Sequence, residues 1–511
     1  MPFHSILHPE PVDPAALQAR EPPEIFHDLN LDQVVRSVTH GREEYDLAPF
    51  FHVALEDVDA ITYRQEVMRD LENEDLAQAM RSFAERMRTM RLTLPKPDKH
   101  YYAYQRERLL LAAVNGYCEA VERLAQALGR LEPASVGVRA LREYLSRHAS
   151  SSSFSVMAAE GRRLRSALAA IRYCVLLDGD VVTVRRYEGE GDYSVVVEGS
   201  FEKFRRGAVQ DFRSTFRDVA GMNHIESQIV ERVARLYPES FRDLAAFCAA
   251  HGDYADGIVL RFDREVQFYL AWLAHLGKFR AAGLSFCYPR LSPASKEIES
   301  RAGFDLALAE KLLGEGAAVV TNDFHLRGAE RIFVVTGPNQ GGKTTFARAF
   351  GQLHYLARLG CPVPGTRARL YLCDRVYCHF ERQEDVATLR GKLKDDLVRI
   401  RSILERATPC SVVVMNEIFS STALKDALFL SRKVLASMSR LDLLGVCVTF
   451  LDELASFDEK MVSMVSGVEP DNPALRTYRI ERRPADGLAY ALSLARKHRV
   501  THDWLKQRIR A

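Results

Sequence analysis

The sequence predicts a multidomain protein with a mainly α-helical region that carries a small β-hairpin, followed by an α/β domain. Two observations lead to this fold class. Through the first two thirds of the 511 residues, apolar side chains recur at steps of three and four, which is the period of a helix packed on one face. After about residue 289, β-type apolar runs alternate with helical stretches, which is typical of a sheet with helices on its faces.

The helical region contains two clear apolar stripes and one change of period. The stripes run from residue 110 to 128 and from 222 to 236, and we interpret both as packing faces. Between them, the valines of 181–184 are followed by a Glu-Gly-Glu-Gly-Asp turn at 188–192 and by the run 193–197. This pattern predicts a β-hairpin in which 181–184 pairs with 193–197.

In the α/β region three apolar runs are expected to be buried strands: 332–335, 412–415 and 446–449. Each run ends at a cluster of polar residues. Open α/β sheets bind their ligands at the carboxyl ends of the strands, so we expect the functional site there.

The first polar cluster matches the P-loop pattern G-x-x-x-x-G-K-[ST] in full. The predicted ATP-binding residues are Gly337, Pro338, Asn339, Gln340, Gly341, Gly342, Lys343, Thr344 and Thr345. Glycines let backbone N–H groups approach phosphates, Lys343 reaches the terminal phosphates, and the Thr344 hydroxyl is a ligand for Mg²⁺. With a strand before it and a helix after it, the motif predicts an α/β P-loop NTPase domain with ATP and Mg²⁺ as cofactors.

The second polar cluster is Asn416-Glu417 at the end of the run 412–415. P-loop ATPases usually place an aspartate first, to hold the water shell of Mg²⁺, and often a glutamate next, to orient the attacking water. Here the first residue is an amide, which brings no charge, so we expect weaker Mg²⁺ binding through water. Glu417 alone reads as a solvated loop residue, but after a P-loop it becomes the candidate catalytic base.

These motifs together resemble the MutS family of DNA mismatch repair proteins. The resemblance rests on the string Thr336-Gly-Pro-Asn-Gln-Gly-Gly-Lys-Thr-Thr345, on Glu417-Ile418 and on the residues after it, and it covers roughly 290–500. Weaker similarity upstream, at 61–67 and in the long helices, resembles the family's core and lever. The resemblance implies a DNA-binding ATPase that forms a homodimer, in which Ser421, Thr422 and Asp426 face the partner's nucleotide. The family loop that offers a serine to that nucleotide falls near Lys392 here, so this sequence departs from the family and we expect Lys392 to supply a charge instead.

Three departures from the family pattern change what we expect. Asn416 replaces the usual aspartate, and Phe450 stands where the family has a histidine beside the terminal phosphate, so hydrolysis should be slow. The sequence ahead of the expected core is too short for the N-terminal domains that read mismatches. We therefore expect DNA binding without mismatch discrimination.

The expected domain organisation follows from these assignments. It consists of an N-terminal extension at 1–30, core and lever helices at 31–178, a clamp-like hairpin segment at 179–215, returning lever helices at 216–288 and the P-loop ATPase domain of MutS type at 289–511.

Contacts with DNA can be predicted only as basic patches, because the formal net charge is just +2. Residues 81–108 and 201–217 combine arginines and lysines with aromatic side chains. In the second patch, Arg205, Arg206 and Arg213 are the candidate phosphate contacts. Solvated helix faces are the alternative for both patches.

The remaining features exclude several protein classes. The first twenty residues lack the basic start and apolar stretch of a secretory signal, and no apolar run can span a bilayer, so a cytoplasmic protein without membrane partners is expected. The nine cysteines are scattered, which favours reduced thiols. A zinc site at Cys373, Cys378 and His379 is the alternative, although it lacks paired short spacings.

Three functions are consistent with the sequence. The first is an ATP-gated dimeric clamp on DNA that acts in repair or recombination. The second is an ATP-binding regulatory switch that engages a protein partner and no DNA. The third, a hydrolase of another P-loop family, is disfavoured by the Gly-Pro-Asn opening of the motif.

Overall fold

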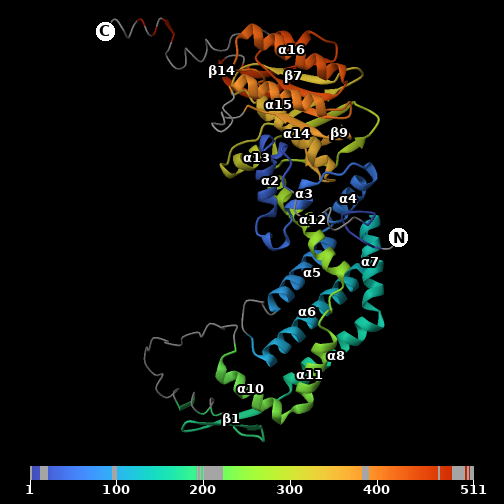
Figure 1. Cartoon of the computed structure of the whole chain (residues 1–511), viewed down its shortest axis with the longest axis vertical. Helices are drawn as coiled ribbons and strands as arrows, with labels where there is room; N and C mark the ends of the chain where they lie inside the picture. The colour runs from blue at the N-terminus through green and yellow to red at the C-terminus, as the bar shows by residue number, and fades with distance from the viewer. Residues whose placement is uncertain are drawn as a thin grey trace. The chain divides into compact units, whose positions relative to one another are not determined.

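The computed structural model describes residues 3–11, 21–94, 101–191, 193, 196, 199–200, 222–381, 391–469, 472–485, 501–502, 504 and 506. The chain forms two compact units (Figure 1). The helical unit contains 75–132 and 140–263, and the sheet unit contains 3–74, 133–139 and the chain from 264 onward.

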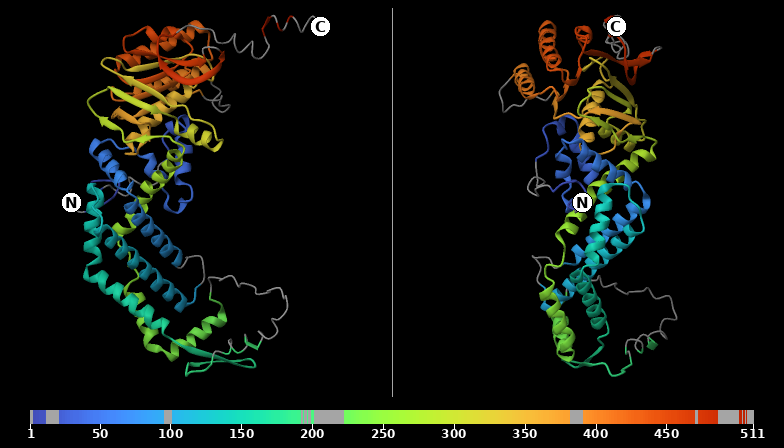
Figure 2. Two further views of the ribbon diagram at one scale, coloured as in Figure 1. Left: turned by 180° about the vertical axis from the view of Figure 1, so that it is seen from behind. Right: turned by 90° about the vertical axis from the view of Figure 1, so that its right-hand side faces the viewer.

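The helical unit is built from long helices and one hairpin, and α6 and α8 run side by side in it (Figure 2). Its elements are α5 (Glu74–Thr93), α6 (Ala103–Gly129), most of α7 (Val136–Ala149), α8 (Ser152–Ala169), β1 (Tyr173–Asp178), β2 (Val181–Arg186), α10 (His224–Leu236), α11 (Pro238–Ala250) and the first turns of α12 (Gly257–Ala281).

Both predicted helical stripes lie on helices of this unit. On α6 the stripe residues Val114, Tyr117, Val121, Leu124 and Leu128 are all buried, so the periodicity identified a packing face correctly. The stripe of α10 is buried only toward its end, where Val233 is enclosed while Ile225 is exposed. A capping box between Asn223 and Glu226 fixes where α10 begins.

The hairpin exists, but the predicted pairing of 181–184 with 193–197 is wrong. β2 pairs antiparallel with β1, from Asp178 opposite Val181 to Tyr173 opposite Arg186. The tight turn between them contains Gly179, whose φ of 58° favours glycine. This turn joins two six-residue strands in continuous register, whereas Tyr193 and Val196 are helical.

The sheet unit combines short N-terminal helices with the α/β elements. Its elements are α1 (Ile25–Asp28), α2 (Leu31–Thr39), η2 (Glu43–Tyr45), α3 (Ala48–His52), α4 (Val58–Asp70), the rest of α12, β3 (Phe286–Cys287), β4 (Arg290–Ser292), β5 (Ile298–Gly303), α13 (Leu306–Gly314), β6 (Asn322–Leu326), β7 (Ile332–Thr336), α14 (Lys343–Arg358), β8 (Val363–Pro364), β9 (Arg367–Tyr371), β10 (Val376–His379), α15 (Lys392–Arg406), β11 (Val412–Asn416), α16 (Leu424–Arg440), β12 (Leu444–Val448), η3 (Asp452–Ser456), β13 (Met461–Glu469) and β14 (Asn472–Arg482).

The principal sheet has the strand order β10-β11-β12-β7-β13-β14, and all neighbours are parallel except β13 and β14. The three predicted strands are β7, β11 and β12, which lie next to one another. Apart from Thr336 and Asn416 at their ends, they are apolar because both faces of the sheet are covered. Ile332 and Val334 pack in one core with α15 and α16, while Phe333 contacts Phe346 and Phe350 of α14.

A second sheet in the same unit has the order β4-β9-β5-β6, and β3 pairs with β8. In this sheet β4 and β9 are parallel, whereas β5 runs antiparallel to both β9 and β6.

Helix α14 is attached along one face to the N-terminal segment of the sheet unit. Side chains spaced by three and four residues donate hydrogen bonds to backbone carbonyls of 28–55: Arg348 to Asp28 (3.1 Å), Gln352 to Leu29 (2.8 Å), Tyr355 to Phe51 (2.9 Å) and Arg358 to Leu55 (3.1 Å). The helix that follows the predicted P-loop is therefore fixed to residues far away in sequence.

The five-segment domain organisation expected from the sequence stays a prediction. Among the residues that the structure describes, no helix is both long enough and apolar enough to cross a membrane.

Candidate active site

The loop between β7 and α14 is shaped by glycines at positions that few other residues tolerate. Gly337 and Gly342 have φ angles of 112° and 93°, in the region that favours glycine. A Cβ on Gly341 would collide with the Ser466 hydroxyl, which itself donates to the carbonyl of Gly341 at 2.7 Å. Only a glycine-rich loop can therefore wrap this closely against β13.

Lys343 begins α14 and is held inside the loop. Its ammonium donates to the carbonyls of Gly337 (2.9 Å) and Pro338 (3.0 Å) and lies 4.8 Å from the centre of the Phe450 ring. Burial lowers the pKa of Lys343, and the negative charge of Glu417 opposes that shift. The side chain is thus positioned over the loop.

The structure brings Thr344 and Asn416 together from separate elements. The Thr344 hydroxyl, on the first turn of α14, donates to Oδ1 of Asn416 at the end of β11 over 2.9 Å. The contact is possible because β7 and β11 flank β12 and end at the same edge of the sheet. Two oxygen atoms of the kind that Mg²⁺ prefers therefore lie side by side.

Glu417 follows Asn416 in a left-handed conformation, with φ of 54°, and its N–H donates to the carbonyl of Val448. A non-glycine residue in this region is strained, which is common at functional sites. Burial raises the pKa of the Glu417 carboxyl, Lys343 lowers it, and the nearby charge of Glu381 raises it further. The group is half-buried, and its raised pKa makes it a stronger proton acceptor than an ordinary glutamate.

The predicted dimer-facing residues occupy the surface beyond β11. Ser421 and Asp426 are exposed and Thr422 is partly so, in the turn before α16 and in that helix's first turn. Lys392 begins α15 and forms an ion pair with Glu381, which also accepts a hydrogen bond from Ser420 at 3.4 Å. Glu381 thus links Lys392 to the surroundings of Glu417.

Sequence reasoning missed three residues that shape the loop. Ser466 reaches it because β13 pairs with β7, and Arg476 of β14 donates to the Asn339 carbonyl at 3.2 Å. Tyr478, also on β14, lies under Gly342 and accepts a hydrogen bond from Asn322. No local motif marks these positions, since only strand pairing brings them to the loop.

The predicted DNA contacts Arg205, Arg206 and Arg213 lie outside the described residues. In the other basic patch, two arginines are engaged within the helical unit: Arg86 pairs with Glu119 at 3.2 Å, and Arg91 pairs with Asp263. For Arg86 and Arg91 the ion pairs favour the alternative interpretation, in which these arginines belong to a helix face and do not contact DNA. Among the residues that are described, no three His, Cys, Asp or Glu side chains gather as a metal site, at Cys373 and His379 or elsewhere.

The site fits a phosphate-bearing ligand with a divalent cation. The first N–H groups of α14 have no side-chain cap, and the helix dipole favours an anion there. Three features lie at the same end of the sheet: the tightly wrapped loop backbone, the Lys343 ammonium, and the side-chain oxygens of Thr344 and Asn416.

Comparison with known proteins relates the same segment to one family. Residues 333–499 match the family described as MutS domain V. Over 178 residues the chain is 26% identical to the DNA mismatch repair protein MutS of Caldicellulosiruptor bescii, covering 34% of this chain and 19% of that protein. Over 189 residues it is 30% identical to endonuclease MutS2 of Gemmatimonas aurantiaca, covering 36% of this chain and 23% of that protein. The chain thus spans less than a quarter of the length of these curated relatives.

Proposed function

We propose that this chain, a MutS family protein over its C-terminal third, is a DNA-binding ATPase that closes as an ATP-gated dimeric clamp in DNA repair or recombination. The observation that carries the proposal is the loop 337–345 with Lys343 folded over it and Thr344 hydrogen-bonded to Asn416. The family match includes all of these residues.

Each residue of the site has a role in this proposal. Backbone N–H groups of the loop and the Lys343 ammonium bind the phosphates of ATP. Thr344 and Asn416 are the residues that would hold Mg²⁺, Thr344 through its hydroxyl and Asn416 through a water, and the ion would supply charge neutralisation on the phosphates when bound. Glu417 orients the attacking water and accepts its proton. Because Asn416 is uncharged and Phe450 offers no hydrogen bond to a phosphate, turnover is slow.

The proposed dimer uses the exposed surface that follows Glu417. Ser421, Thr422 and Asp426 contact the nucleotide of the second subunit, and Lys392 supplies a positive charge there. ATP favours the closed dimer because its phosphates contact both subunits. Because ATP makes more contacts in the closed dimer than in the open form, its binding shifts the equilibrium toward the closed dimer.

DNA binding in this proposal depends on backbone contacts and not on mismatch reading. Affinity should fall by roughly 0.9 log units per log unit of salt for each phosphate neutralised. Replacing Arg205, Arg206 and Arg213 together by Ala should flatten this dependence and leave ATP binding unchanged. The ratio of the affinity for a mismatched duplex to the affinity for a perfect duplex should be near one.

The test is a salt titration of DNA binding with a nonhydrolysable ATP analogue, beside a measurement of mass in solution and of ATP turnover with and without DNA. We expect the analogue to produce a dimer that binds DNA at low salt, and DNA to stimulate turnover. A chain that binds ATP but stays monomeric and binds no DNA would contradict the clamp. That result would favour a regulatory switch for a protein partner.

A further inference from the structure

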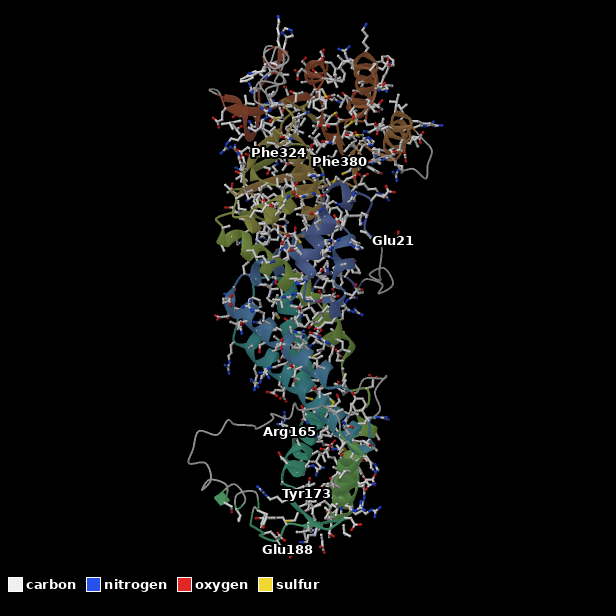
Figure 3. The ribbon with its side chains drawn as sticks, turned by 90° about the vertical axis from the view of Figure 1, so that its left-hand side faces the viewer. Glu21, Arg165, Tyr173, Glu188, Phe324 and Phe380 are labelled. Carbon is white, nitrogen blue, oxygen red and sulfur yellow. The ribbon has the colours of Figure 1, made fainter. Side chains whose placement is uncertain are left out.

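A cavity of about 540 Å³ opens in the helical unit between α6, α8, α10 and α11, beside the first residue of β1. Its volume lies in the usual range of ligand sites. Much of the wall is aliphatic, including Leu111, Leu168 and Val233. Figure 3 labels two of its lining residues, Arg165 on α8 and Tyr173 on β1, at the same end of the unit.

Three aromatic side chains line this cavity. Tyr104 of α6 and Phe241 of α11 meet edge to face, with ring centroids 5.0 Å apart. Tyr173 stands at the opening, 42% exposed. Aromatic rings in such positions can stack on any nucleobase, because every base presents a π-face.

Two arginines give the cavity a positive opening. Arg108 of α6 and Arg165 of α8 are exposed, and neither forms an ion pair or hydrogen bond with another described residue. No Asp or Glu occurs among the described residues that line the cavity. By contrast, Arg162 and Arg163 on the same helix are paired with Glu122 (2.9 Å) and Asp243 (3.0 Å).

The unpaired guanidinium groups match the geometry of phosphate oxygens, since the arginine fork binds them with two parallel hydrogen bonds. An apolar, aromatic interior with a cationic opening therefore favours a ligand that has a flat apolar part and an anionic part. A nucleotide is such a ligand. Within a duplex the base is covered by its neighbours, so the cavity can accept it only outside the stack.

We propose that this cavity binds an unpaired nucleotide of DNA, with its base against Tyr104, Tyr173 and Phe241 and its phosphates on Arg108 and Arg165. The inference rests on the proposed DNA-binding function and specifies which DNA is preferred: a duplex joined to a single-stranded segment. A mismatched base pair keeps its bases stacked in the helix, so mismatch preference remains near one.

The test compares the full chain on two labelled DNAs: a blunt duplex, and the same duplex with a single-stranded oligothymidylate extension. We expect wild type to bind the extended DNA on the order of 10-fold more tightly, which is the typical effect of one stacked base. The double variant Arg108→Ala/Arg165→Ala should lose this preference and retain its affinity for the blunt duplex. Ala112→Trp, which fills the cavity without changing charge, should also lose the preference and retain its affinity for the blunt duplex.

The matched control is Arg162→Ala/Arg163→Ala, which removes the same number of charges, both on α8 and outside the cavity, and should keep the preference. A 5-iodouracil in the extension should crosslink on irradiation to Tyr104, Tyr173 or Phe241, as located by mass spectrometry.

The outcomes separate the two proposals. Equal affinity of wild type for both DNAs would overturn the cavity and leave the clamp standing. Binding of neither DNA would overturn both. A preference that survives in the Arg108→Ala/Arg165→Ala variant, or crosslinks confined to other residues, would show that unpaired nucleotides bind elsewhere.

Discussion

The sheet unit and the helical unit build their candidate sites in different ways. In the sheet unit, nine consecutive residues from Gly337 to Thr345 form the loop, and one hydrogen bond from Thr344 connects it to Asn416. In the helical unit, the cavity is lined by residues spread from Tyr104 to Leu244 on five different elements. A site made by one turn of backbone can be recognised in sequence, whereas a site made by helix packing cannot.

The two units also differ in what their positive charges contact. Lys343 is held by backbone carbonyls of its own loop. In the helical unit, two arginines on the same helix differ: Arg163 forms an ion pair with Asp243, while Arg165 has no ion-pair partner among the described residues. A basic run in sequence therefore identifies a binding surface only after the carboxylates that contact it are known.

The largest expected effect tests the catalytic role in the sheet unit. Glu417→Gln should lower ATP turnover by about 10²- to 10⁴-fold, the typical contribution of a general base, because the amide cannot accept the proton. ATP affinity should not change, since Lys343 and the loop remain. Steady-state turnover and fluorescent-nucleotide binding measure the two quantities. Turnover equal to wild type would remove Glu417 from the mechanism.

The next effect tests the loop itself. Lys343→Ala should weaken ATP binding by about 1.5–3 kcal/mol, the value of a hydrogen bond to a charged group, which is roughly 10- to 150-fold. Calorimetric titration with ATP and Mg²⁺ measures it. Lys311→Ala, on the exposed side of α13, is the matched control and should bind normally. Unchanged affinity in Lys343→Ala would contradict the assignment of the loop.

A third effect tests the dependence of the sheet unit's stability on pH. Burial lowers the pKa of His8 to about 3 and of His354 to about 4, and both lie in the sheet unit. These histidines stay neutral when folded but become protonated when unfolded below pH 6.5. The sheet unit should therefore lose stability as pH falls from 6.5 to about 4, by up to about 1.4 kcal/mol per pH unit for each histidine.

Hydrogen exchange of peptides from the sheet unit, corrected for intrinsic rates, measures this loss. His354→Gln should reduce the slope because the titrating group is removed. An identical slope in that variant would show that His354 does not contribute.

A smaller effect concerns the amide at the end of β11. Asn416→Asp keeps the acceptor for Thr344 and adds a charge beside the expected Mg²⁺, so the Mg²⁺ concentration needed for ATP binding should fall about threefold to tenfold. ATP affinity at saturating Mg²⁺ should stay the same. A Mg²⁺ titration of nucleotide binding decides the matter, and an unchanged midpoint would exclude Asn416 from the metal site.

The smallest effect concerns the surroundings of Glu417. Because the charge of Glu381 raises the pKa of Glu417, Glu381→Gln should lower it and move the acid limb of the pH–rate profile to lower pH. The shift should be small, since Glu381 is exposed and solvent screens its charge. A shift to higher pH, or none, would mean that another group sets the acid limb.

The sequence by itself determined the elements whose information is local. The motif from Gly337 to Thr344 fixed the loop, since its backbone angles require glycine at 337 and 342. Continuous apolar runs identified β7, β11 and β12, and the three-and-four spacing identified α6. In each case the pattern reflects a period or a dihedral preference of neighbouring residues.

Only the tertiary structure decided the features that depend on long-range contacts. The hairpin partner of β2 was mispredicted because two turns compete locally, and the longer continuous register through Gly179 prevails. Ser466 against Gly341, the attachment of α14 to 28–55, and the cavity at Arg108 and Arg165 all join residues far apart in the chain. Local preferences carry no information about such contacts, because their free energy arises only when the distant elements pack.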